Sequence, residues 1–205
     1  MKLLYQTHSP YARKVLVAAH EAGLAAGLDV VHHETSPLLA NDEVSALNPL
    51  GKVPVLLCDD GFVLFDSDVI CEYLDGRARV RLIPDDPQRR WRALRAQAIA
   101  QGIADAGIGA RWESERRPPP LRWDAMREGL LRKIALACDF LENDRGDDGP
   151  PDIGDIAVAT ALSWIEFRDV LAFRDGRPRL AAWYERFCER PSMRATALSG
   201  DTRDR

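Results

Sequence analysis

The chain has 205 residues, 46% of them hydrophobic, and a formal net charge of −4 at neutral pH. This is enough apolar material for a buried core, and it predicts one or two domains. The 28 basic residues are interleaved with acidic ones rather than gathered in one block, which is typical of solvated helix faces. We therefore expect no nucleic-acid binding.

The sequence also bears on the compartment and on metals. The first residues hold a very short apolar run that His8 and Ser9 interrupt, so we expect no signal peptide. Charged residues break every apolar run before the roughly 18 residues of a membrane-spanning helix. The four cysteines are widely spaced, and the neighbours His32 and His33 point to opposite faces of an expected strand. We expect a cytoplasmic protein with reduced cysteines and no metal site.

Residues 1–76 alternate between strand and helix patterns. In chain order we expect a strand over 1–5, a helix over 11–22, a strand over 28–33, a short helix over 42–47, strands over 53–58 and 62–65, and a helix over 68–74. The turn Asp59-Asp60-Gly61 joins the last two strands into a hairpin. This order predicts an α/β domain with a small mixed sheet.

Helical periodicity replaces this alternation in the second half of the chain. Residues 77–88 carry mixed charges and two prolines, and we place a linker there. Helices are expected over 89–112, 122–142, 153–171 and 180–190, with a Pro118-Pro119-Pro120 break after the first and a Gly/Asp/Pro-rich loop after the second. Residues 89–205 are therefore expected to form an all-α helical bundle domain.

Three short segments could bind a ligand, and Ser9-Pro10 is the first. Serine is favoured as a helix N-cap and proline at the first helical position, so Ser9 could be only a cap. However, the segment lies between the first expected strand and the first helix. Ligands of open α/β sheets collect at such turns, over the positive end of the helix.

The other two segments are Val53-Pro54 and Asp66-Ser67. Proline holds the residue before it in an extended conformation, which could leave the Val53 backbone for a ligand, although a structural proline at a strand start is the simpler interpretation. The helix start at Asp66-Ser67 offers unpaired N–H groups to an anion and a carboxylate to an ammonium, although an ordinary capped helix fits as well. Together the three segments fit a small, zwitterionic, peptide-like ligand.

Longer stretches around these segments carry a family resemblance. "SPYARKVLVAAHEAGL", "NPLGKVPVL" and "LFDSDVICEYL" resemble, in this order and spacing, the glutathione S-transferase superfamily. "PDIGDIAVATAL" is similar to the capping box in the helical core of that family, and "LAAWYERFCERPSMRAT" to its last long helix. The resemblance covers nearly the whole chain and implies a thioredoxin-like glutathione-binding domain over 1–76 and an all-helical C-terminal domain.

The resemblance also implies how glutathione is bound. It places a cis peptide bond before Pro54, pairs the Val53 backbone with the cysteinyl part of glutathione, and brings Lys52 to the glycyl carboxylate. It assigns Asp66 and Ser67 to the γ-glutamyl group. Glutathione would be a co-substrate, and no metal is implied.

Ser9 matches the position that hydrogen-bonds the glutathione sulfur in the serine-type classes, where the cysteine-type thiol transferases and dehydroascorbate reductases carry cysteine. Holding a thiol of pKa about 8.5 as thiolate near neutral pH needs about 2.7 kcal/mol. A helix N-terminus supplies at most about 2 kcal/mol and a charged hydrogen bond about 1.5–3 kcal/mol. We expect Ser9 to stabilise a bound thiolate rather than to act as a nucleophile. This role disfavours a hydrolase that uses His8. A further contact to the sulfur from Thr7, Tyr5 or Tyr11 stays open.

Residues in the second half have structural or lining roles. Asp152 and Asp155 fit a helix N-cap and a carboxylate three residues on, and we assign both to folding. An electrophile pocket is expected between the domains. Its lining residues, chosen by position, are Ala106, Arg111, Trp112 and Trp164.

The resemblance implies a glutathione transferase that activates the thiol for attack on a small hydrophobic electrophile. It also implies a homodimer with the helix from Arg89 as partner surface. The alternative is a non-catalytic binding or regulatory protein on the same scaffold. A glutathione-dependent reductase is disfavoured by serine at position 9, whereas conjugation, dehalogenation, peroxide reduction and isomerisation all stay open.

Overall fold

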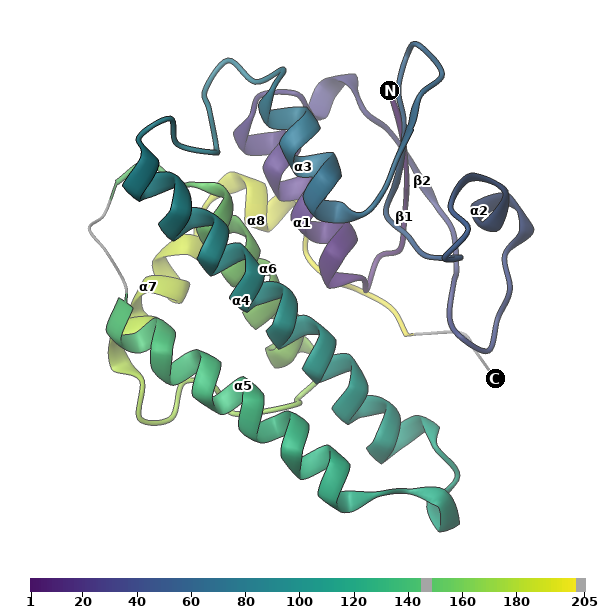
Figure 1. Cartoon of the computed structure of the whole chain (residues 1–205), viewed down its shortest axis with the longest axis vertical. Coiled ribbons are helices and arrows are strands. Elements are labelled where there is room, and N and C mark those ends of the chain that lie inside the picture. The colour runs from purple at the N-terminus through teal and green to yellow at the C-terminus, as the bar shows by residue number, and fades with distance from the viewer. Residues whose placement is uncertain (145–148, 202–205) are drawn as a thin grey trace. The chain divides into compact units, whose positions relative to one another are not determined.

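The computed structural model describes residues 1–144 and 149–201, which form two compact units (Figure 1). The first comprises residues 1–86 and 191–201, and the second comprises Pro87–Arg190. The first contains a small mixed sheet and the second is helical, so the expected fold class is confirmed. Within the described ranges, no helix is long and apolar enough to cross a membrane.

The first unit is built on a four-stranded sheet with the order β2-β1-β3-β4. The strands are β1 (Lys2–Tyr5), β2 (Asp29–His32), β3 (Val55–Leu57) and β4 (Val63–Leu64). β1 pairs parallel with β2 and antiparallel with β3, and β4 completes the expected hairpin. The third strand was expected from residue 53 but begins at Val55, because Pro54 has no N–H to donate to the ladder.

Helices cover both faces of this sheet. α1 (Pro10–Glu21) and α3 (Ser67–Asp75) pack against each other, and a short 3-10 turn η1 (Ala25–Gly27) connects α1 to β2. α2 (Asp42–Leu47) contributes Val44 to a separate core cluster with Leu4 and Val55. Leu3 and Leu4 are both buried although strand neighbours point to opposite faces, so the sheet has a core on each side.

Residues 191–201 return to the first unit. α8 (Pro191–Ala195) packs on α1, where the buried guanidinium of Arg13 donates through Nη2 to the carbonyl of Met193 at 2.9 Å. The resemblance implied one long last helix here. Instead, helix α7 (Pro178–Cys188) ends before Pro191, because proline cannot continue the hydrogen bonding of a helix interior.

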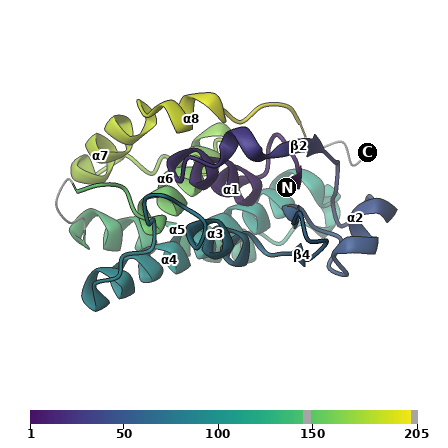
Figure 2. The same cartoon turned by 90° about the horizontal axis from the view of Figure 1, so that it is seen from above.

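The second unit is a helical bundle. Its elements are α4 (Pro87–Arg111), a π-helical turn η2 (Trp112–Arg116), a short 3-10 turn η3 (Pro119–Leu121), α5 (Asp124–Asp144), α6 (Ile153–Phe167) and α7. α4 packs on both α5 and α6, and α4 and α5 run side by side in Figure 1 and Figure 2. At the crossing of α4 and α6, a Cβ on Gly154 would lie 2.6 Å from the carbonyl oxygen of Ala93, so this approach requires glycine.

One expectation for the bundle was wrong, and another falls on residues that the structure does not describe. The third of its helices was expected to reach residue 171 but ends at Phe167, where Asp169 adopts a left-handed φ of 49°. The Gly/Asp/Pro-rich loop was expected after the second helix, and its residues 145–148 lie outside the described residues.

Candidate functional site

The sheet register brings the three expected ligand-binding segments to one edge of the first unit. β1 ends there at Tyr5, and the antiparallel β3 begins there at Val55. β4 runs antiparallel to β3 and therefore also ends at this edge. The segments attached to these strand ends are residues 6–9, 52–54 and 65–67. This edge, which we call the sheet-edge site, gathers every residue that the sequence suggested for glutathione.

Ser9 caps α1 at this edge. Its Oγ accepts a hydrogen bond from the N–H of Ala12 at 3.2 Å, and Pro10 is the first helical residue. Ser9 is 7% exposed. A hydroxyl that accepts through a lone pair still has its hydrogen to donate. Ser9 can therefore cap the helix and donate to a bound anion at the same time, over the positive end of the helix.

The loop before β3 is ordered by Asn48, which the sequence analysis left without a role. Its buried side chain donates through Nδ2 to the carbonyl of Lys52 at 2.8 Å and accepts through Oδ1 from the N–H of Leu50 at 3.0 Å. The next peptide bond, Val53–Pro54, is cis, as the resemblance implied. The two side-chain hydrogen bonds fix the backbone that leads into Val53. The signal was present in the sequence, since asparagine favours such local backbone bonds.

The third segment forms the start of α3. Asp66 is the N-cap, and its Oδ1 accepts from the N–H groups of Asp68 and Val69 at 3.0 and 3.4 Å. The helix therefore begins at Ser67 rather than at residue 68 as expected. Ser67 is 1% exposed, and its Oγ has no hydrogen-bond partner among the described residues. Because buried hydroxyls are nearly always hydrogen-bonded, this oxygen is suited to a ligand.

A partly buried ion pair, which had not been expected from the sequence, joins α1 to the start of α3. The ammonium of Lys14 pairs with the carboxylate of Asp68, although the Lys14 side chain is only 4% exposed. Removing Asp68 would leave the buried ammonium of Lys14 without its counter-charge, so the pair helps to hold the two helices together. Nearby, burial raises the pKa of Cys71 to about 12, although the positive charge of Lys14 acts in the opposite direction. Cys71 is therefore a neutral thiol at physiological pH.

A polar cluster is formed around Gln6, whose carbonyl accepts from the N–H of Ser9. Gln6 donates through Nε2 to Oε2 of Glu34 at 2.8 Å, and Nε2 of His32 lies 2.8 Å from Oε1 of the same carboxylate. Nε2 of His8 lies 3.9 Å from Oε2 of Glu34. Burial by itself would raise the pKa of Glu34, but the hydrogen bonds from Gln6 and His32, together with the nearby His8, hold the pKa below its usual value. His8, for which no role was expected from the sequence, therefore belongs to this cluster.

The residues proposed for the electrophile pocket all belong to the second unit. Ala106 and Trp164 are buried, and the Trp164 ring packs against α4 beside Gly107. Arg111 forms an ion pair with Glu115 at 2.9 Å, and Trp112 begins the turn η2. Trp164 thus has a packing role inside the bundle.

Asp152 and Asp155 also lie in the second unit. Oδ1 of Asp152 accepts from the N–H of Asp155 at 3.1 Å, and Oδ2 of Asp155 accepts from the N–H of Asp152 at 3.3 Å. The two carboxylates therefore form a reciprocal capping box at the start of α6.

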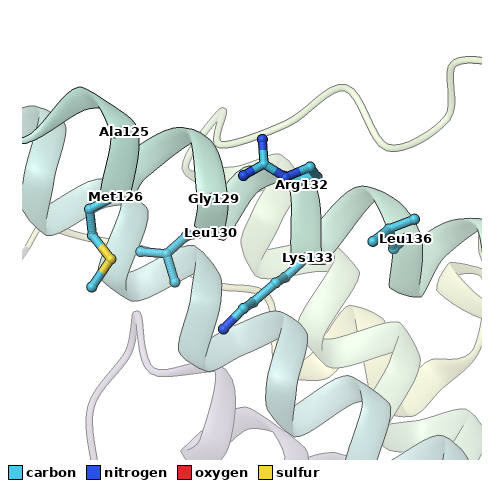
Figure 3. A pocket seen from close by; sticks show the side chains of 7 residues that line it. All are labelled: Ala125, Met126, Gly129, Leu130, Arg132, Lys133 and Leu136. Carbon is cyan, nitrogen blue, oxygen red and sulfur yellow. The ribbon is translucent and has the colours of Figure 1, made fainter.

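A shallow groove on α5 lies in the second unit as well. Figure 3 shows Met126, Leu130 and Lys133 directed to one side of the helix. The groove contains no residue that the sequence suggested for glutathione. Among the described residues, no group of three or more histidine, cysteine, aspartate or glutamate side chains could hold a metal ion.

Two family matches account for most of the chain. Residues 8–77 match the family described as "Glutathione S-transferase, N-terminal domain", and residues 96–186 match "Glutathione S-transferase, C-terminal domain". The chain therefore belongs to the glutathione S-transferase family.

Individual relatives agree with this assignment over nearly their full length. The chain is 38% identical to a glutathione transferase family member from Pseudomonas fluorescens Pf-5, solved with bound glutathione, with a TM-score of 0.91 over 97% of this chain and 99% of that one. It is 37% identical to a glutathione S-transferase from Methylobacillus flagellatus KT with GSH bound, with a TM-score of 0.84 and the same coverage. It is also 30% identical to the uncharacterized GST-like protein YibF of Escherichia coli (strain K12), over 96% of this chain and 98% of that protein.

Proposed function

We propose that this protein is a glutathione transferase that binds glutathione at the sheet-edge site and stabilises its thiolate with Ser9. The observation that carries the proposal is the hydrogen bond from the Ala12 N–H to Ser9 Oγ, which leaves the hydroxyl hydrogen for a sulfur above the start of α1. The thiolate would then attack a small hydrophobic electrophile. Two relatives, 38% and 37% identical, have structures with glutathione bound, which supports the co-substrate.

The polar groups of the sheet-edge site match the parts of glutathione. The γ-glutamyl carboxylate would accept from Ser67 Oγ, which is buried and without a partner in the described structure, and from the backbone N–H of Ser67, because the next two N–H groups of α3 already donate to Asp66. The ammonium would bind Oδ2 of Asp66, because the capping bonds use Oδ1. The cysteinyl backbone would pair with Val53, and Lys52 would approach the glycyl carboxylate. No metal takes part in this scheme.

The second substrate would be held partly by the helical domain. We retain Ala106, Arg111, Trp112 and Trp164 as proposed lining residues, with Arg111 and Trp112 more available than the two buried side chains. We also retain the functional division into a glutathione-binding domain over 1–76, a linker over 77–88 and a helical domain over 89–205, which differs from the two compact units in that residues 191–201 pack with the first of them. Conjugation, dehalogenation, peroxide reduction and isomerisation all use the same bound thiolate.

We further propose that the chain works as a cytoplasmic homodimer. None of the four cysteines, all of which lie in the described residues, forms a disulfide bond, as expected in a reducing compartment. Large apolar side chains are 41–68% exposed on the neighbouring helices α4 and α5, and a second copy could cover them. They are Trp91, Met126, Leu136 and Phe140.

Calorimetric titration with glutathione, followed by turnover of an activated aryl halide, tests the proposal against the non-catalytic alternative. Millimolar or tighter binding with turnover that Ser9→Ala reduces at unchanged affinity would support it. Binding without turnover of any electrophile in a panel would favour a binding or regulatory protein. Absence of binding at millimolar glutathione would overturn the enzyme assignment.

A further inference from the structure

The turn that positions Ser9 depends on Gln6, whose side chain is hydrogen-bonded to a different segment of the chain. The N–H of Ser9 donates to the carbonyl of Gln6 at 3.0 Å, closing the turn between β1 and α1. Gln6 is 6% exposed, although it is polar and lies at a strand end. Its amide donates to Oε2 of Glu34 at 2.8 Å and to the carbonyl of Thr35 at 3.1 Å. The position of the Gln6 carbonyl, and so of Ser9, therefore depends on these two acceptors.

Glu34 is itself fixed on several sides. Its Oε1 is 2.8 Å from Nε2 of His32 at the end of β2, and its backbone carbonyl accepts from Nδ2 of Asn41 at 3.1 Å. Asn41 also caps α2 through its Oδ1. Glu34 thus ties the turn before Ser9 to β2 and to α2, all within the first unit. A carboxylate with both oxygens engaged by hydrogen-bonding groups is well ordered.

We propose that Glu34 is a positioning residue for Ser9 and acts through the side-chain amide of Gln6. The inference rests on the proposed role of Ser9 in stabilising the glutathione thiolate. Glu34 acts through hydrogen bonds rather than through its charge, because a negative charge near a thiolate disfavours the thiolate. The positioning and the charge of Glu34 therefore act on the thiol pKa in opposite directions, and substitutions can separate them.

Three substitutions separate the effect of positioning from the effect of the charge. Gln6→Met keeps the length of the side chain but removes both hydrogen bonds of the amide. Glu34→Ala removes the acceptor, whereas Glu34→Gln removes only the charge, since its Oε1 can accept from Gln6 and its Nε2 can donate to one tautomer of His32. Glu43→Ala is the matched control, because Glu43 is another glutamate of the same unit whose side chain is 81% exposed.

The readout is the ultraviolet absorbance of bound glutathione thiolate against pH, with the dissociation constant of glutathione measured in parallel. We expect Gln6→Met and Glu34→Ala to raise the pKa of the bound thiol by roughly 0.5–1 unit, a part of what one charged hydrogen bond contributes. Glu34→Gln should not raise the thiol pKa, and Glu43→Ala should leave it unchanged. The glutathione affinity should change by less than about threefold, because only the contact to sulfur is disturbed.

The other possible outcomes would each contradict either the positioning role of Glu34 or the proposed function. If Ser9→Ala raises the thiol pKa but Gln6→Met and Glu34→Ala do not, the positioning role is wrong and the proposed function stands. If Glu34→Ala and Glu34→Gln both lower the thiol pKa, the charge dominates and positioning is again wrong. If Ser9→Ala itself has no effect, the proposed function fails and this inference with it. Should Glu34→Ala fail to fold, Gln6→Met alone decides.

Discussion

The side-chain amide of Asn48 donates to the main-chain carbonyl of Lys52 at 2.8 Å, across the loop that precedes the cis bond of Val53–Pro54. Asn48 is 2% exposed, and loss of its amide removes the partner of the Lys52 carbonyl and of the Leu50 N–H. The loop carries two of the groups proposed to contact glutathione. The Asn48 side chain therefore links a local turn to ligand affinity.

We predict that Asn48→Ala weakens glutathione binding about tenfold. Leaving a hydrogen-bonding group without its partner costs about 1–3 kcal/mol, and part of this cost would appear as a loop that is less well ordered before glutathione binds. Isothermal calorimetry measures the change. Asn143→Ala is the control, because that side chain also donates to a backbone carbonyl but is exposed on α5. Wild-type affinity in Asn48→Ala would contradict the role of the loop.

Because Asp152 and Asp155 form a capping box, we expect a substitution there to lower the stability of the protein but not its activity. Asp152→Ala should lower the free energy of unfolding by about 0.5–2 kcal/mol, because the N–H of Asp155 loses its acceptor. Urea denaturation measures the change, and Asp152→Ser should recover most of it. An unchanged unfolding midpoint for Asp152→Ala would show that the cap does not stabilise the bundle.

Acid should remove the contribution of Glu34 to stability. Its pKa in the folded protein lies below the ordinary value of 4.5, so the ionised form stabilises the fold above about pH 4.5. This stabilisation is lost as the pH falls through the folded pKa. The difference in melting temperature between wild type and Glu34→Gln should therefore be smaller at about pH 3 than at about pH 5. A difference that grows toward acid would have the wrong sign.

Two of the four cysteines, Cys71 and Cys138, should be poor nucleophiles in the folded protein. Burial raises the pKa of Cys71 to about 12 and that of Cys138 to about 11. Iodoacetamide near neutral pH should therefore leave both unmodified in the native protein, as mass spectrometry can determine. Glutathione-dependent turnover should survive the same treatment. Loss of turnover in step with alkylation of Cys71 would instead indicate cysteine chemistry.

The exposed apolar side chains of α4 and α5 predict a surface for self-association. Leu136→Glu should convert a dimer into a monomer, because a charge would be buried in the contact. Light scattering after size exclusion measures the mass. Leu38→Glu is the control, since Leu38 is 68% exposed but lies in the other unit, close in exposure to Leu136 at 64%. A monomeric wild type would contradict the proposed homodimer.

Local sequence signals predicted the elements that depend on near neighbours. The alternation of apolar residues gave the strands, and the Ser9-Pro10 pair marked the start of α1 within one residue. Pro54 marked the start of the third strand, but the strand is shorter than expected because Pro54 has no N–H for the ladder. The end of α6 was missed, since a left-handed φ at Asp169 has no strong signature in a non-glycine residue.

Contacts between distant residues could not be predicted in the same way. Gln6 and Glu34 are 28 residues apart, and Lys14 and Asp68 are 54 apart, so neither pair leaves a periodic trace in the sequence. They become neighbours only through the parallel pairing of β1 with β2 and the packing of α1 on α3. The local part of the sheet-edge site was therefore visible in the sequence, whereas the residues that hold it in place were not.

The pKa of the thiol of bound glutathione, followed by ultraviolet absorbance in wild type and Ser9→Ala, tests the central claim most directly. We predict a thiol pKa roughly 2 units below the free value of about 8.5 in the wild type. In Ser9→Ala the pKa should rise by roughly 1–2 units, because one charged hydrogen bond is lost. Equal thiol pKa values in the two proteins would contradict the role of Ser9, even if both bind glutathione.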